Sequence, residues 1–274
     1  MKTRTIGLAQ TIQTADLDRN RETIFRFMDQ ASEAGVEILC FPEAQTVGYR
    51  VDITAADLPS PKTELDTLHK EVARQCAANN MNCILGTETP VEGSKPYNSA
   101  LVIDNQGTVL GAHHKTRLTP LDALAYSPGN EMSTYMLSGV RVGVVICYEG
   151  FRYAETTASC VEQGAQLIFH PQNNTTRPND WKIPIHHALI VARAAENTVW
   201  FASCNACFAV NQNSRTMIVC PDGTIDSQVE LGQETLLVSE IDIDKATRAM
   251  FRYDMSDTVE ILFADTVKAH ELKI

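Results

Sequence analysis

The sequence predicts an α/β fold, because short apolar runs alternate with amphipathic stretches of helical length. Residues 141–147, Arg-Val-Gly-Val-Val-Ile-Cys, indicate a buried strand, since the run is short, rich in β-branched residues and followed by a turn. An internal repeat adds to this: residues 33–43 align without gaps on residues 162–172. In both copies a glycine ends a helix and a proline ends the next strand. We therefore expect a single domain, residues 1–274, with two internally related halves.

The first half begins with a strand, a helix and a strand. Residues 5–10 and 36–41 are strand-like, and residues 17–34 between them place apolar side chains at helical spacing. This order predicts a parallel pair of strands joined by a helical crossover. The remaining elements are expected as a helix over 63–79 and strands over 82–87, 97–104 and 108–115, the last two joined as a hairpin.

The second half repeats this alternation after residue 141. We expect helices over 153–164, 185–196 and 245–252, and strands over 198–203, 215–220, 224–229 and 235–243. The tail, residues 254–274, contains apolar pairs without an obvious partner within the chain. It is expected to pack on a neighbouring subunit.

Composition narrows the class of protein. With 274 residues, 44% of them hydrophobic and 21% charged, the chain can form a large core. The net charge of −11 argues against nucleic acid and anionic membranes as partners. No apolar run is long enough for a membrane span or a secretory signal, so a cytoplasmic location is expected. In that compartment the eight irregularly spaced cysteines would be free thiols.

Three residues at the ends of predicted strands could act together. Cys147 offers a sulfur nucleophile, Glu43 a carboxylate that can take the thiol proton, and Lys115 an ammonium that can stabilise an oxyanion. Each also has an ordinary structural explanation: an inert buried cysteine, a solvated loop acid and a solvated basic edge. Spacing along the sequence does not place the three side chains together.

Several motifs resemble those of the nitrilase superfamily, the carbon–nitrogen hydrolases. They are Phe41-Pro-Glu43 followed by Gly48-Tyr49, His114-Lys115, and Val142-Gly-Val-Val-Ile-Cys147-Tyr-Glu149. Supporting segments at 97–103, 127–129 and 221–223 follow in the expected order. The resemblance implies a four-layer α-β-β-α sandwich, a homodimer or larger homo-oligomer, and a catalytic triad of Glu43, Lys115 and Cys147.

The match also has departures. Many members of this family carry a further acid shortly before Pro-Gly, and the nearest candidate here is Asp122, with a shorter side chain than the usual residue. The segment after the cysteine, residues 148–155, is one residue longer than the commonest form. The remaining candidates for oxyanion or substrate binding are Tyr49, Tyr148, Glu149, Asn173, Asn174 and Trp181.

The resemblance implies a cysteine-dependent hydrolase of small, non-peptide C–N bonds that forms a thioester intermediate. A linear amide or an N-carbamoyl compound is the favoured substrate class, and no metal or organic cofactor is expected. One alternative is a nitrilase acting on a C≡N group. Nitrilases often have the motif Cys-Trp-Glu, and Glu149 matches its glutamate, although Tyr148 replaces the tryptophan. Another is a non-catalytic member that binds a small molecule or a partner protein.

Overall fold

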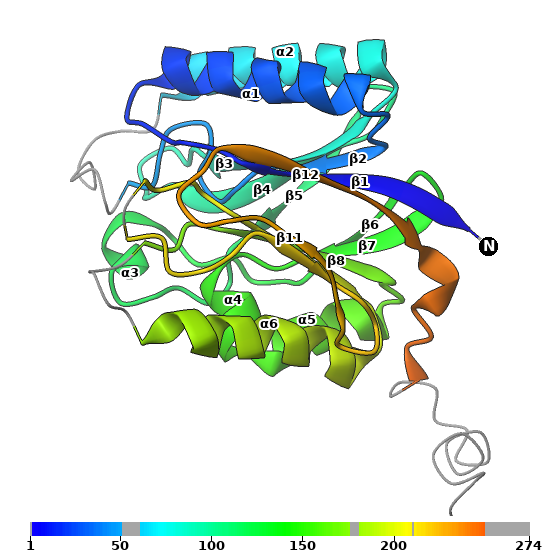
Figure 1. The fold of residues 1–274 in the computed structure, drawn as a ribbon. Helices are drawn as coiled ribbons and strands as arrows, with labels where there is room; N and C mark the ends of the chain where they lie inside the picture. Colours follow the sequence, from blue (N-terminus) through cyan, green and yellow to red (C-terminus); the bar gives the residue numbers. More distant parts are fainter. Residues whose placement is uncertain (1, 51–60, 176–180, 210, 250–274) are drawn as a thin grey trace, which may run out of the picture.

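Two six-stranded sheets lie face to face, with helices covering the outer face of each (Figure 1). The computed structural model describes residues 2–50, 61–175, 181–209 and 211–249. Helices α1 (Leu17–Glu33) and α2 (Lys62–Asn79) cover one sheet, and α4 (Tyr148–Arg152), α5 (Ala154–Glu162) and α6 (Lys182–Asn197) cover the other. This arrangement confirms the expected four-layer α-β-β-α sandwich.

The first sheet has the order β12-β1-β2-β3-β4-β5. Its strands are β1 (Thr3–Gln10), β2 (Ile38–Cys40), β3 (Asn82–Thr89), β4 (Tyr97–Ile103), β5 (Val109–His114) and β12 (Thr235–Asp242). Strand β2 runs parallel to both of its neighbours, and the hairpin β4–β5 extends the sheet in antiparallel fashion. The carboxyl end of β2 therefore lies in the middle of the sheet.

The second sheet has the order β11-β10-β9-β8-β7-β6. Its strands are β6 (Thr134–Leu137), β7 (Val140–Val144), β8 (Leu167–Gln172), β9 (Trp200–Asn205), β10 (Met217–Val219) and β11 (Ile225–Gln228). Strand β8 is parallel to β7 and β9, as β2 is to β1 and β3. The predicted repeat is therefore also a repeat of structure. Strand β12 flanks β1 in the first sheet as β6 flanks β7 in the second.

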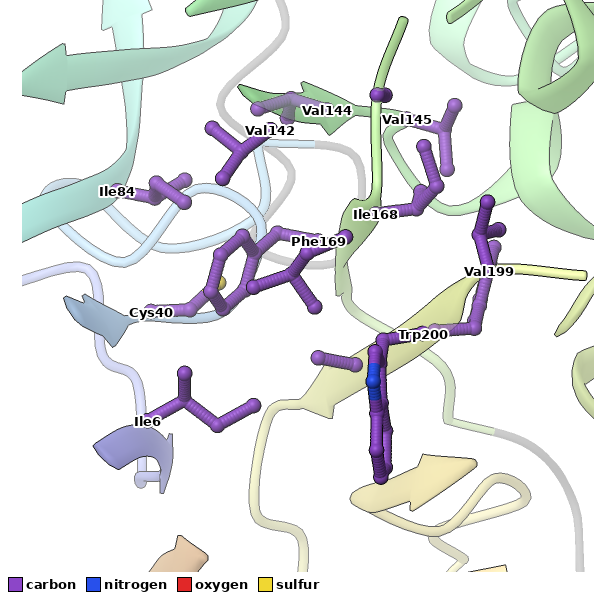
Figure 2. Packing of buried hydrophobic residues seen from close by; sticks show 14 of the residues in the cluster. Ile6, Cys40, Ile84, Val142, Val144, Val145, Ile168, Phe169, Val199 and Trp200 are labelled. Atoms are coloured by element: carbon purple, nitrogen blue, oxygen red, sulfur yellow. The ribbon is translucent and has the colours of Figure 1, made fainter. Parts of the chain in front are cut away.

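The main core fills the space between the two sheets. Figure 2 shows Ile6, Cys40 and Ile84 of the first sheet beside Val142, Val144 and Phe169 of the second. A smaller apolar cluster lies between the first sheet and its helices, where Phe27 and Met28 of α1 meet Leu68 and Val72 of α2. Burial on both faces explains why the central strands are continuous apolar runs.

Some expected elements differ in the structure. Strand β6 and helix α3 (Asp122–Ala125) were not predicted, and β7 ends at Val144 rather than at Cys147. The helix expected over 245–252 is wrong across its described part. A 3₁₀ turn, Ile243–Lys245, is followed by an irregular segment, because the backbone N–H groups of Arg248 and Ala249 bond to Thr198 instead of continuing a helix. The tail, 254–274, lies outside the described residues.

Across the described ranges, none of the helices combines the length and the apolar character that crossing a bilayer requires.

Candidate active site

The structure brings Glu43, Lys115 and Cys147 into one buried cluster. Glu43 follows β2, Lys115 directly follows β5, and Cys147 lies beyond β7 on the turn into α4. Their exposed fractions are 1%, 0% and 8%. The Nζ atom of Lys115 lies 2.7 Å from Oε1 of Glu43. Strand ends from both sheets thus converge on one carboxylate, one ammonium and one sulfur.

Glu43 is held by three donors. Its Oε1 accepts from Lys115 and, at 2.7 Å, from the side-chain amide of Asn98, while Oε2 accepts from the backbone N–H of Asn173 at 2.9 Å. Burial raises the pKa of Glu43, the neighbouring Lys115 lowers it and Asp122 raises it, so that the pKa is raised overall. A carboxyl group with a raised pKa is suited to accepting and returning a proton. Asn98 was missed; its only signal was a polar residue within an apolar strand.

Lys115 also contacts the second acid, Asp122. Its Nζ atom lies 2.9 Å from Oδ2 of Asp122, whose other oxygen accepts a hydrogen bond from the hydroxyl of Tyr49. Burial would raise the pKa of Asp122, but Lys115 and Tyr49 lower it below its usual value. Burial alone would lower the pKa of Lys115, yet Glu43 and the other nearby acids raise it well above normal. Lys115 therefore stays charged between two unlike carboxyl groups.

Cys147 has a strained backbone, with φ 48° and ψ −104°. Its N–H donates to the carbonyl of Pro171 at 2.9 Å, and its own carbonyl accepts from Phe151 at 3.3 Å. Burial and the charge of Glu43 raise the pKa of the thiol, while Lys115 lowers it, and the pKa is well above its ordinary value. The sulfur is therefore a thiol until a neighbouring base removes its proton.

Tyr148 begins helix α4 immediately after the nucleophile. In the part of the chain that the structure describes, its backbone N–H has no hydrogen-bond acceptor, as expected for the first turn of a helix. The ring packs edge-on against Tyr153, with centroids 5.4 Å apart. Helix α4 thus presents this N–H at the turn that carries Cys147, while the ring packs on Tyr153.

The structure directs the Glu149 carboxylate toward protein donors rather than toward Cys147. The side chain is fully buried, and its carboxylate accepts from Thr116 N–H and O–H, Ile146 N–H and His113 Nε2 at 2.6 to 2.8 Å. Burial would raise the pKa of Glu149, but His113 and these hydrogen bonds lower it to about 2. Each carboxylate oxygen of Glu149 accepts two hydrogen bonds from the protein. These bonds stabilise the turn that carries Cys147.

The remaining candidates divide between the site and the surface. Asn173 donates through its backbone to Glu43, and its side-chain amide donates to Gln13 at 2.7 Å. The side-chain amide of Asn174 donates to the Cys147 sulfur at 3.3 Å. Trp181 stands at the start of α6 with 64% of its surface exposed. Asn173 and Asn174 therefore belong to the cluster, whereas Trp181 lies on the surface.

The chain is similar in sequence to known hydrolases of carbon–nitrogen bonds. The profile of the carbon–nitrogen hydrolase family matches residues 4–250. An (R)-stereoselective amidase from Pseudomonas sp. is 29% identical, the match covering 80% of this chain and 77% of that protein. Omega-amidase NIT2-A of Xenopus laevis is 27% identical, covering 87% and 88%.

Among solved structures, a variant of the amidase from Nesterenkonia sp. AN1 has a similar fold, with a TM-score of 0.78 and 20% identity over 94% of this chain and 97% of that one. That structure shows covalent addition of the acetamide moiety of fluoroacetamide at the active-site cysteine. On the match that spans nearly its whole length, this chain belongs to the carbon–nitrogen hydrolase family.

Proposed function

We propose that this protein hydrolyses a small linear amide through a thioester formed on Cys147. The observation that carries the proposal is the contact between the buried Lys115 ammonium and Glu43, 2.7 Å away. Cys147, whose φ is positive, lies in the same cluster. The amidases among its relatives support the same reaction. A buried ion pair of this kind is costly to maintain, and perturbed pKa values are typical of sites that move protons.

The reaction begins with proton transfer from the Cys147 thiol to Glu43. The sulfur attacks the carbonyl carbon, and the oxyanion accepts hydrogen bonds from the Lys115 ammonium and the Tyr148 N–H. When the tetrahedral intermediate collapses, the C–N bond breaks and the proton on Glu43 passes to the leaving amine. A thioester remains on Cys147. Glu43 then takes a proton from water, and the water oxygen attacks the thioester. The C–S bond breaks, the carboxylic acid leaves, and Glu43 returns its proton to the Cys147 sulfur.

Asp122 has a different role in this scheme. Because its pKa is lowered, it stays ionised and holds the Lys115 ammonium in place while Glu43 changes protonation state. Tyr49 supports it by donating to its other oxygen. The arrangement resembles other enzymes in which two nearby acids with separated pKa values take separate tasks.

The experiment compares primary amides, N-carbamoyl compounds and nitriles that carry the same short alkyl group. We expect ammonia release to be fastest from the amide or the N-carbamoyl compound, and a mass increase equal to the acyl group on Cys147 after acid quenching. Faster ammonia release from the nitrile would make the protein a nitrilase. If no compound in the panel is turned over and no acyl group is trapped, the non-catalytic alternative is favoured.

We also propose that the protein works in a reducing compartment, the cytoplasm, as a homodimer or larger homo-oligomer. The eight cysteines are free, and seven of them are buried, which is typical of chains that do not rely on disulfides. Light scattering coupled to gel filtration measures the oligomeric state directly, and a mass of 30.2 kDa would contradict the assembly.

A further inference from the structure

A chain of side chains leads away from the Cys147 sulfur. The side-chain nitrogen of Asn174 donates one hydrogen to that sulfur, at 3.3 Å, and another to Oε1 of Gln172, at 2.8 Å. The Nε2 atom of Gln172 donates in turn to the hydroxyl oxygen of Ser203, at 2.6 Å. Each amide is therefore fixed in orientation by the next group.

The same chain returns to Cys147 through a histidine. The hydroxyl of Ser203 lies 2.9 Å from Nδ1 of His170, and Nε2 of His170 lies 2.9 Å from the carbonyl oxygen of Cys147. Residues 170 and 203 are direct partners in the register of β8 and β9. The series of hydrogen bonds thus begins at the sulfur of one residue and ends at its carbonyl.

The donors and acceptors have only one consistent assignment. The Cys147 carbonyl can only accept, so His170 carries its hydrogen on Nε2. Burial lowers the pKa of His170 to about 3, which leaves the ring neutral and Nδ1 an acceptor for the Ser203 hydroxyl. The Ser203 oxygen then accepts from Gln172, and Gln172 accepts from Asn174. Turning over the Gln172 amide would set its NH₂ group against that of Asn174, and turning over the Asn174 amide would set its oxygen against Oε1 of Gln172.

Packing leaves this series little freedom to move. His170, Gln172 and Ser203 are fully buried, and the His170 ring lies edge-on to Phe151 with centroids 4.7 Å apart. Gly150 provides the space for that ring, because a Cβ atom there would lie 2.7 Å from its Nε2 atom. A buried hydrogen-bond network in which every member is satisfied is rigid.

We propose that His170, Ser203, Gln172 and Asn174 form a ring of positioning residues that orients the Asn174 amide on the Cys147 sulfur and stabilises its thiolate. The inference rests on the proposed function, in which Cys147 must lose its proton. Hydrogen bonds to an ionised acceptor are about twice as strong as those between neutral groups, so the Asn174 amide favours the thiolate over the thiol. At the other end of the ring, His170 holds the carbonyl of the strained residue.

The test is the apparent pKa of the Cys147 thiol, taken from the pH dependence of its alkylation by iodoacetamide and read by peptide mass spectrometry. We expect Asn174→Ala to raise this pKa by about one unit, since a hydrogen bond to a charged group is lost. Ser203→Ala should raise it by less, because the amide of Asn174 remains but is no longer held in orientation. Ser214→Ala is the matched control: its buried hydroxyl has no hydrogen-bond partner among the described residues.

A double variant distinguishes a ring from independent structural effects. If Ser203 acts through Asn174, the double variant Ser203→Ala/Asn174→Ala has the same thiol pKa as Asn174→Ala alone. Additive shifts, or no shift in Asn174→Ala, would overturn the proposal. Asn174 is only partly buried, so Asn174→Asp provides a further variant that should fold; its carboxylate should raise the thiol pKa more than alanine does. Alkylation needs no amide substrate, and so a failure of the ring is distinguishable from a failure of the proposed reaction.

Discussion

The ammonium nitrogen of Lys115 lies 2.9 Å from Oδ2 of Asp122, and this contact gives the cluster two carboxyl groups of unlike character. The charge of Asp122 raises the pKa of Glu43, whereas Lys115 and Tyr49 lower that of Asp122. One acid can therefore exchange protons while the other stays ionised beside the same ammonium.

Replacing Asp122 by asparagine should make Glu43 a weaker base. The variant Asp122→Asn removes a negative charge that raises the pKa of Glu43, so the acidic limb of the kcat/KM profile should move to lower pH. We expect kcat to fall by about tenfold to a hundredfold, measured by ammonia release. Tyr49→Phe, which leaves the carboxylate in place, should have a smaller effect. An unchanged pH profile in Asp122→Asn would contradict this role.

Glu43→Gln should stop proton transfer. Glutamine has almost the same volume and occupies the equivalent position, Gln172, in the second half of the chain. We expect kcat to fall by roughly a thousandfold, because general acid–base catalysis contributes about 10² to 10⁴. The exposed Glu64→Gln serves as the control. Full activity in Glu43→Gln, or in Cys147→Ala, would rule out the reaction as proposed.

Glu149→Gln should destabilise the protein. An amide cannot accept all of the hydrogen bonds that this buried carboxylate receives, and its NH₂ group would face donors such as the Ile146 N–H, now 2.6 Å from Oε2. We expect the free energy of unfolding to fall by about 2–4 kcal/mol in urea titrations. Glu155→Gln, on the exposed face of α5, should cost almost nothing. Equal stabilities of the two variants would show that Glu149 does not fasten the turn.

Two histidines, His69 and His170, make the free energy of unfolding depend on pH. Burial lowers the pKa of His69 from 6.5 to about 4 and that of His170 from 6.5 to about 3. Each is neutral in the folded chain at a pH where the unfolded chain is protonated. Their contribution is therefore complete above pH 6.5 and is lost as the pH falls through the window down to the folded pKa.

The variant His69→Gln isolates one of these groups. Between pH 6.5 and 4.5 we expect its unfolding free energy to fall less steeply than that of the wild type, by up to about 1.4 kcal/mol per pH unit. Comparing the two proteins cancels Glu43, which acts in the opposite sense because its pKa is raised. Parallel curves from urea unfolding at three pH values would contradict the assignment.

The fold was largely predictable because its central strands are buried on both faces. Their apolar runs, the repeat at residues 33–43 and the capping glycines are local signals. Strand β6 was missed, since only Leu137 of its four residues is buried and no alternation is visible. The helix expected after residue 245 failed for another reason: the backbone bonds to Thr198, a tertiary contact that local pattern does not report.

The cluster was predictable only in its residue types. Glu43, Lys115 and Cys147 lie at the ends of predicted strands and within motifs that resemble those of the family, which made them candidates. Asp122 was found by counting back from Pro128. Which other residues join the cluster depends on the direction of their side chains, which the sequence does not show. Glu149 turns toward His113 and Thr116, at the end of a strand of the opposite sheet. Asn98 reaches Glu43 from β4, which is separated from β2 by β3. The link between His170 and Ser203 depends on the register of two strands, which a single sequence does not reveal.

Strand β12 pairs with β1 along its whole length, from Thr3 opposite Asp242 to Gln10 opposite Thr235. During synthesis on the ribosome, β1 emerges well before its partner β12, because most of the family profile lies between them. One edge of the first sheet therefore stays unpaired until residues 235–242 have been made, and an unpaired edge of eight residues readily recruits other chains. A nascent chain that stalls before residue 235 would keep this edge unpaired, so synthesis of β12 protects the first sheet from aggregation through β1.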